Sequence, residues 1–417
     1  MNEPIFIARQ DTLEQEILPA HWLAQYKLFG EESYTFQDKG IWKKLCMSSA
    51  AANDRDIHAE ALEEMLTTFS AEHTGKWMLL VYGTNAAALE GLATMAAIAA
   101  NGTAMGAIVD NALLMHAIAN SETAMQRIAN SQTAMQRVAN NRGAMDAIGR
   151  SRIARDAVQA SPYYNSCIKE NDMAIAKLAV ALANLESAGY SGMAGVAADS
   201  TAMTAVAASS VARNAISASP YYDEKIKEND MAIAKLVVGF ANLASANYSS
   251  MAGVVADATA MTAVAASSTA MTAVAASGVA LKAIAQAYKN TANMLQFLKA
   301  VNASDTLIKR IYNTLTNATA LFGASQLGAQ DGVADANSWA TTSAAPNAFL
   351  ACACGYYNSG GANVDVTYNG TAIAQNKTGT RQPGSVTSTN VNAITMAPST
   401  FTENGDGWLA VQKFTVK

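Results

Sequence analysis

Few residues of this chain have the types and spacing that chemistry requires. The histidines near the N-terminus have carboxylates beside them, but their spacing matches no metal-site pattern such as H-E-x-x-H. We interpret these groups as solvated helix faces: His58 with Glu60, Glu63 and Glu64, and His73 with Glu72. The sequence has no nucleophile elbow, phosphate loop, dinucleotide fingerprint, zinc motif or kinase motif set. It predicts no catalytic residue, no metal and no cofactor, and it does not indicate an enzyme.

One group of residues near the C-terminus has the composition of a ligand site. Aromatic rings alternate there with Asn and Asp, and a glycan site needs flat apolar faces beside directional hydrogen-bonding groups. Rings at strand spacing are more often part of a core, so both interpretations stay open. The candidate glycan-binding residues are Tyr356, Tyr357, Asp365, Tyr368 and Trp408. Asp406, between Gly405 and Gly407, is interpreted as a hairpin turn and not as a calcium ligand or catalytic acid.

The four cysteines show neither a disulfide framework nor a metal framework. Cys352 and Cys354 are two residues apart, so on a strand they point to the same face and are poorly placed to bridge each other. We interpret all four, including Cys46 and Cys167, as reduced thiols in a reducing compartment.

The bulk composition excludes several classes of function. The net charge is -5 and only 15% of the 417 residues are charged, whereas nucleic-acid binding needs clustered Lys and Arg. No run of about 18 strongly apolar residues occurs, so membrane insertion is not expected. The acidic start, MNEPIFIARQDTLEQEILPAHW, does not have the pattern of a signal peptide, which predicts synthesis in a cytoplasm.

A ten-residue repeat organises the middle of the chain. ADATAMTAVA, ASSTAMTAVA and ASGVALKAIA follow one another from Ala256, and the same frame places Met at 95, 105, 115, 125, 135 and 145. Ten residues of a continuous helix turn about 1000°, about 80° short of three turns, so the apolar stripe would wind around it. We therefore predict one short helix per decad, with Met and Val buried, Ala at the close contacts and Ser, Asn or Asp as N-caps. The predicted cap positions are Asn120, Ser121, Asn130, Ser131, Ser209, Ser210, Ser267 and Ser268.

A second, longer repeat is present. The stretch from Ser161 recurs almost unchanged from Ser219, an offset of 58 residues, and each copy holds a longer apolar helix after Asn-Asp. The SPYY block before that helix predicts a break.

The predicted fold is mainly α, a solenoid-like array of short helices, with a small antiparallel β-sandwich at the C-terminus. The β prediction comes from short β-prone runs separated by Asn-Gly, Gly-Gly and Asp-Gly turns. The predicted parts are an N-terminal attachment domain at 1–85, a first decad array at 86–160, two 58-residue units at 161–285, a helical cap and linker at 286–334, and the β-sandwich at 335–417.

The decads TAMTAVAASSTAMTAVAAS resemble the decapeptide arrays of tail fibres and related appendage proteins of tailed bacteriophages, and NAITMAPSTFTENGDGWLAVQKFTVK is similar to the small β-rich domain that closes such fibres. The resemblance implies a structural protein of the virion, assembled in the host cytoplasm. It further implies attachment to other virion proteins by the N-terminal part, contact with a host surface glycan or protein by the C-terminal domain, and a homotrimer.

Our leading hypothesis is therefore a non-enzymatic fibre that contacts the host surface. The alternative is a scaffold element of the virion, such as a collar, baseplate or capsid-decorating protein. A bacterial adhesin is disfavoured because the sequence shows no export signal or cell-wall anchor. A glycan depolymerase would need a carboxylate pair in a groove, which the sequence does not indicate.

Overall fold

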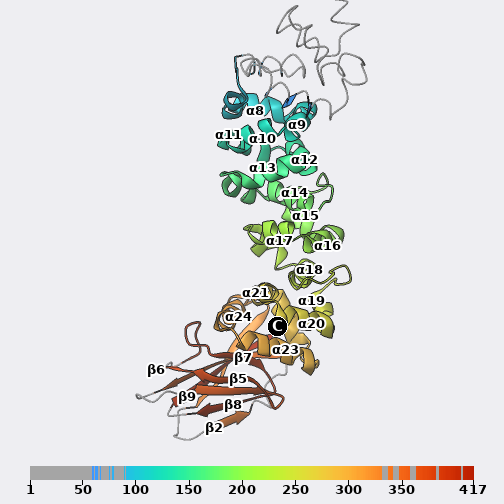
Figure 1. Ribbon diagram of the computed structural model, residues 1–417. Coiled ribbons are helices and arrows are strands. Elements are labelled where there is room, and N and C mark those ends of the chain that lie inside the picture. Colours follow the sequence, from blue (N-terminus) through green and yellow to red (C-terminus); the bar gives the residue numbers. More distant parts are fainter. Residues whose placement is uncertain are drawn as a thin grey trace, which may run out of the picture. The chain divides into compact units, whose positions relative to one another are not determined.

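The computed structural model describes residues 91–330, 337–340, 347–356, 363–381, 385–404 and 407–417. It also describes eight single residues nearer the N-terminus: Ala59, Glu60, Leu62, Glu63, Leu66, Gly75, Met78 and Leu89. The chain divides into two compact units (Figure 1). The first unit extends to Gly195 and includes Asn214–Pro220, and the second comprises Val196–Arg213 and Tyr221–Lys417. The predicted fold class is confirmed, with an array of short helices followed by a small β region.

Each decad of the first unit forms one short helix, as predicted. A helix begins directly after a polar residue with extended backbone and ends about eight residues later, before the next polar residue. The helices are α7 (Met95–Ala100), α8 (Gly102–Val109), α9 (Ala112–Ala119), α10 (Glu122–Ala129), α11 (Gln132–Ala139), α12 (Arg142–Arg150), α13 (Arg152–Ala160) and the longer α14 (Asp172–Leu182).

Three consecutive helices make one turn of the array. The axes of α8 and α9 diverge by 102°, so the chain changes direction at every polar corner. Helix α7 then packs on α10, α8 on α11, α9 on α12, and α10 on α13. A decad therefore packs against the decad three repeats away as well as against its neighbours in sequence.

The buried face of every decad is the one that the repeat predicts. The Met and the Ile or Val that follows it three residues later are fully buried, for example Met125 with Ile128 and Met135 with Val138. Where Ala precedes the Met, as in most decads, this Ala is also fully buried, which lets the neighbouring turn approach closely. Each buried Met, Ile or Val contributes about 1.5–3 kcal/mol.

The cap serines bind two helices at once. The Ser151 hydroxyl accepts a hydrogen bond from the Ala154 amide of its own helix at 3.2 Å and donates to the Ala119 carbonyl oxygen, 32 residues earlier, at 2.5 Å. Ser131 makes the same pair of bonds, with Ala134 at 3.3 Å and with Ala99 at 2.6 Å. One hydroxyl thus satisfies an orphan amide at a helix start and a carbonyl one turn away.

Asparagine caps achieve the same connection through both ends of the side-chain amide. The Asn141 oxygen accepts from the Ala144 amide at 2.9 Å, and its Nδ2 donates to Asp110, 31 residues earlier, at 2.9 Å. Asn171 repeats this pattern, and its Nδ2 donates to Asn140 at 2.9 Å. Asn140 is itself a C-cap, as are Asn120 and Asn130, so those two predicted N-caps belong to the preceding helices.

Glu63 is joined to the array and is not a solvated helix face. Its carboxylate accepts hydrogen bonds from the Ser121 hydroxyl at 2.5 Å, the Thr123 hydroxyl at 2.5 Å and the Thr123 amide at 3.1 Å. These groups belong to the N-terminus of α10, where a negative charge is favourable. The rest of the predicted attachment domain at 1–85 lies almost entirely outside the described residues.

The two 58-residue copies have the same elements. In each copy the SPYY block leads into a short π-helix, η6 (Tyr164–Lys169) or η7 (Tyr222–Ile226). The predicted break is therefore followed by an additional short helix before the longer helix begins. The second unit continues with α16 (Ser200–Ala208), α18 (Asp230–Phe240), α19 (Met251–Ala256), α20 (Ala258–Ala266), α21 (Ser268–Ala276), α22 (Gly278–Gln286), α23 (Thr291–Asn302) and α24 (Asp305–Asn317). Helices α15 (Met193–Ala198) and α17 (Ser210–Ser217) cross the division between the units.

The C-terminal strands form two small sheets. The first has the order β1-β9-β3-β6, with β7 also paired to β3, and the second has the order β2-β8-β4-β5. All pairs are antiparallel except β3 with β6. The strands are β1 (Phe322–Gln330), β2 (Asn337–Ala340), β3 (Ala348–Tyr356), β4 (Asn363–Tyr368), β5 (Thr371–Thr378), β6 (Thr380–Arg381), β7 (Ala393–Met396), β8 (Ser399–Asn404) and β9 (Gly407–Val416).

The β region begins earlier than the predicted boundary at residue 335. Strand β1 starts at Phe322, within the stretch expected to be a helical cap and linker, and it pairs with β9 along its length. The strand, FGASQLGAQ, is rich in small and polar residues and lacks the β-branched residues that indicate a strand in the sequence.

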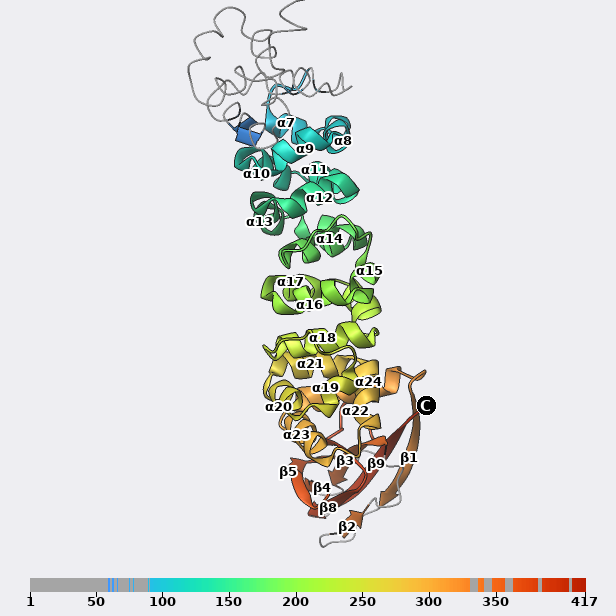
Figure 2. The ribbon, with the colours of Figure 1, turned by 90° about the vertical axis from the view of Figure 1, so that its right-hand side faces the viewer.

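The sheets form the next layer of the helical array and not a detached domain. Helix α22 contacts β9, α23 contacts β5 and β7, and α24 contacts β1 and β7 (Figure 2). One cluster of buried residues runs from Ile233 to Phe414, with the ring of Tyr312 edge-on to Phe414 at 5.7 Å. Buried Asn302 donates to the Ile394 carbonyl oxygen at 2.7 Å and accepts from the Ile394 amide at 3.0 Å.

The cap bonds can be tested on adjacent serines. The Ser267 hydroxyl accepts from the Ala270 amide at 3.2 Å and donates to the Phe240 carbonyl oxygen at 2.9 Å, whereas Ser268 is the exposed first residue of α21. We expect Ser267→Ala to lower the free energy of unfolding by about 1–2 kcal/mol because both bonds are lost. Ser268→Ala is the matched control and should leave it within about 0.5 kcal/mol. Equal effects in denaturant titrations would contradict the two-helix role of the cap.

The continuity of helices and sheets predicts which fragments fold. A fragment of residues 335–417 lacks β1 and exposes buried Phe349 and Phe414, each worth about 1.5–3 kcal/mol when covered. A fragment of residues 196–417 keeps the whole helical cover. We expect cooperative thermal unfolding by circular dichroism for the longer fragment only. A cooperative transition of the shorter fragment would show that the β region is independent.

Candidate functional site

Strand pairing brings two predicted glycan-binding residues to neighbouring positions. Tyr356 near the end of β3 pairs with Gly407 of β9, and Gly355 pairs with Trp408. The side chains of Tyr356 and Trp408, and all of Tyr357, lie outside the described residues. Their binding role therefore stays a prediction.

The other two predicted residues lie on β4, in the second sheet, and have structural roles. Tyr368 is 1% exposed and its hydroxyl donates to the Tyr288 carbonyl oxygen at 3.5 Å. Burial raises the pKa of Tyr368. A ring with no exposed face cannot stack on a sugar, which corrects its assignment to the ligand-binding set in favour of the core. The Asp365 carboxylate accepts a hydrogen bond from the Asn376 amide at 2.6 Å. Asn376 has a positive φ and lies in β5 where the pairing register with β4 shifts.

No candidate metal centre forms within the part of the chain that the structure describes: no three His, Cys, Asp or Glu side chains are grouped there. Cys167, Cys352 and Cys354 are buried and are not disulfide-bonded, while Cys46, Gly405 and Asp406 lie outside the described residues. Among the described residues no single helix is long and apolar enough to cross a membrane. Two bent helix pairs, 102–119 and 258–276, would pass by length and composition alone.

The arginines of the first array do not form a continuous basic stripe. Arg127 and Arg137 occupy the same position of consecutive decads, on α10 and α11. Consecutive helices belong to different sides of a turn, so residues ten apart in the sequence face different directions.

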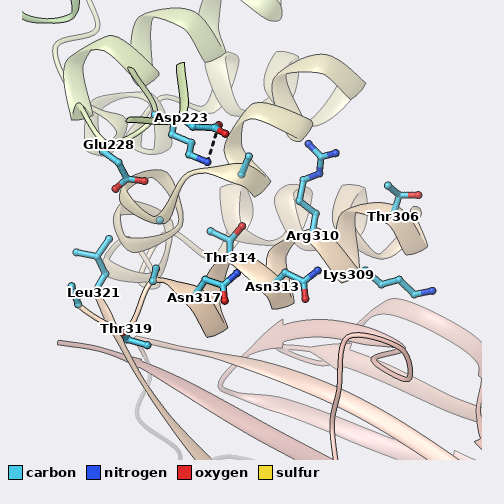
Figure 3. A pocket seen from close by; sticks show the side chains of 15 residues that line it. Asp223, Glu228, Thr306, Lys309, Arg310, Asn313, Thr314, Asn317, Thr319 and Leu321 are labelled. Carbon is cyan, nitrogen blue, oxygen red and sulfur yellow. Dashed lines mark ion pairs between the residues drawn. The ribbon is translucent and has the colours of Figure 1, made fainter. Parts of the chain in front are cut away.

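A cavity lies along α24, within the second unit. It has a volume of about 850 Å³, and we refer to it as the α24 groove (Figure 3). The exposed face of α24 forms one wall, the segment after η7 forms the other, and small residues lie between them. The groove is lined by Asp223, Lys227, Glu228, Ala276, Gly278, Thr306, Lys309, Arg310, Asn313, Thr314, Asn317, Ala318, Thr319, Ala320 and Leu321.

The two walls of the α24 groove are electrostatically different. On the η7 side, Lys227 pairs with Asp223 at 2.9 Å, and Ser277 donates to the Lys227 carbonyl oxygen at 2.6 Å. Burial raises the pKa of neighbouring Tyr222 to about 12, the Asp223 charge adds to this rise, and the Arg310 charge opposes it. The α24 side carries amides, hydroxyls and the cations Lys309 and Arg310 (Figure 3).

The sequence predicted residues 306–321 as part of the helical cap and linker at 286–334, and the other lining residues as part of the 58-residue units at 161–285. The α24 groove is lined by residues 223–228 and by residues 306–321. These two segments are far apart in the sequence, and the folding of the array places them side by side. The only sequence signal was the helical spacing of polar residues Thr306, Arg310, Asn313 and Asn317 on one face of α24.

Two buried lysines occupy equivalent positions in the 58-residue copies but have different partners. Lys177 contacts Asp146 at 2.5 Å and the Ser187 carbonyl oxygen at 3.0 Å. Lys235 contacts carbonyl oxygens only, those of Ser245 at 3.1 Å and Ala246 at 3.2 Å. The position equivalent to Asp146 is Thr204, on the helix that packs against α18. Burial lowers the pKa of Lys235.

The lowered pKa of Lys235 predicts a pH dependence of stability. The unfolded chain keeps the Lys235 proton at pH values where the folded chain has begun to release it. The free energy of unfolding should therefore rise with pH between the lowered folded pKa and the ordinary value near 10.5. Lys235→Met should remove this rise in denaturant titrations at a series of pH values. Thr204→Asp, which supplies the missing carboxylate, should reduce it, and an unchanged slope in both variants would contradict the assignment.

The described residues thus form a polar groove along α24. They contain no group of three side chains that could bind a metal ion. In comparisons with known proteins, no family model matches this chain and no curated protein matches it.

Proposed function

We propose that this chain is a bacteriophage structural protein, a tail fibre or another fibre that projects from the virion. Its N-terminal part attaches to other virion proteins and its C-terminal β region contacts the host cell surface. The protein is not an enzyme, uses no cofactor, and is a homotrimer by analogy with such fibres. It is assembled in the host cytoplasm and resides in the virion.

The observation that supports this proposal most strongly is the uniform construction of the decad array. Most decads repeat one buried Met with one Ile or Val, and caps such as Ser131 and Ser151 join their decads to the preceding turn. Helices that pack in this way lie about 8–10 Å apart. The number of decads therefore sets the length of the array in steps of three, a property that suits a spacer between two contact sites.

A scaffold element of the virion is the alternative. The same array would serve as a spacer in a collar, baseplate or capsid-decorating protein, whose β region would then bind a virion protein. Glu63 favours neither function, since its contact with α10 is internal to the chain.

Labelled virions separate the two functions. Gold-labelled antibodies to residues 400–417 should mark the distal ends of projections in electron micrographs of particles that contain this chain. The purified full-length protein should also bind host cells saturably. Labelling of the particle body, together with capture of a virion protein and no binding to cells, would favour the scaffold. The absence of label from all purified particles would contradict both.

A further inference from the structure

Two smaller cavities of the second unit share lining residues with the α24 groove or with each other. Lys309 lines both the α24 groove and a cavity of about 350 Å³ between α24 and the β region. Lys377 lines that cavity and a third one, of about 430 Å³, between α23 and β5. We refer to these three neighbouring cavities together as the track, in the order α24 groove, Lys309, middle cavity, Lys377, last cavity.

The track carries more positive than negative charge, although the whole chain has a net charge of -5. Asp223 neutralises Lys227, and Asp305 pairs with Lys377 at 3.2 Å. Three further cations line the track: Lys299, Lys309 and Arg310. Within the described part of the chain these three form no ion pair, and Glu228 is the one further carboxylate among the lining residues.

Neutral hydrogen-bonding groups accompany these cations. Asn313 and Asn317 are one helical turn apart on α24, both are exposed, and both line the groove beside Arg310 (Figure 3). Each side-chain amide presents a donor and an acceptor, which matches the vicinal hydroxyls of a sugar. Arg310 presents a planar set of donors that matches a carboxylate or phosphate group.

We propose that this track binds an extended anionic polysaccharide, an inference that rests on the proposed function and places a receptor site on the helical layer. Arg310 and Lys309 pair with the acidic groups, while Asn313 and Asn317 bind sugar hydroxyls. The carboxylates of Glu228 and Asp305 make the track unfavourable for a nucleic acid, which carries a phosphate at every nucleotide.

Binding of defined oligosaccharides to the full-length protein tests this site. The probes are oligogalacturonate, which carries carboxylates, a phosphorylated mannan oligosaccharide, a neutral dextran oligosaccharide of equal length, and oligothymidylate. Isothermal titration calorimetry should detect the two anionic glycans and not dextran, with affinity that falls as salt increases. The preferred anionic probe distinguishes a carboxylate from a phosphate ligand.

Variants locate the binding within the track. Arg310→Ala should weaken the anionic glycan about tenfold or more, because a charge-assisted hydrogen bond is lost. Asn313→Ala removes an amide without changing the charge and should weaken binding several-fold. Arg152→Ala is the control, since Arg152 is an exposed arginine of the first unit paired with Asp156. It should leave affinity unchanged.

The outcomes distinguish the site from the proposed function. Equal binding of dextran, tighter binding of oligothymidylate, an unchanged affinity of Arg310→Ala, or no binding of any probe would overturn the polysaccharide site. If Arg310→Ala still binds host cells as the unaltered protein does, the site is wrong and the host-contact function stands. If the unaltered protein binds oligogalacturonate but no label appears on virions, the proposed function fails and the site stands.

Discussion

The structure depends on corners at which one hydroxyl or amide binds two helices, as at Ser131, Ser151 and Ser267. A single decad buries too little apolar surface to offset the entropy of ordering ten residues. The cap of Ser151 links its own helix to the carbonyl of Ala119 one turn earlier, so helix initiation and stacking occur together. Removing that link leaves an orphan amide and an orphan carbonyl at the same corner. The array is therefore stable only as a stack.

Three helices per turn decide which residues meet. Side chains ten positions apart face different sides, and those about three decads apart are neighbours. The same rule separates Arg127 from Arg137 and brings Ser151 to the carbonyl group of Ala119. The strands form the final layer of the array. They pack against the sides of α22, α23 and α24 that no further helix covers. The α24 groove exists because this last layer leaves one face of α24 uncovered.

The 58-residue duplication shows that equal sequences acquire different electrostatics when their covering layers differ. Lys177 and Lys235 are copies, and each is buried and bound to two carbonyl groups. The helix that covers Lys177 comes from the decad array and supplies Asp146, whereas the helix that covers Lys235 supplies Thr204 at that position. A similar exchange occurs at the closest contacts, where Gly149 faces Ala181 in one copy and Ala207 faces Gly239 in the other.

The sequence by itself determined the short helices, their buried Met, Ile and Val residues and the positions of most caps, because a ten-residue period imposes them locally. It also determined the two-copy organisation and the β character of the C-terminal region. Only the tertiary structure decided that β1 begins at Phe322, that Tyr368 is buried, that Glu63 caps α10, and which residues line the α24 groove. The physical reason is that these features depend on contacts between residues far apart in the chain, which the number of helices per turn selects and no local pattern encodes.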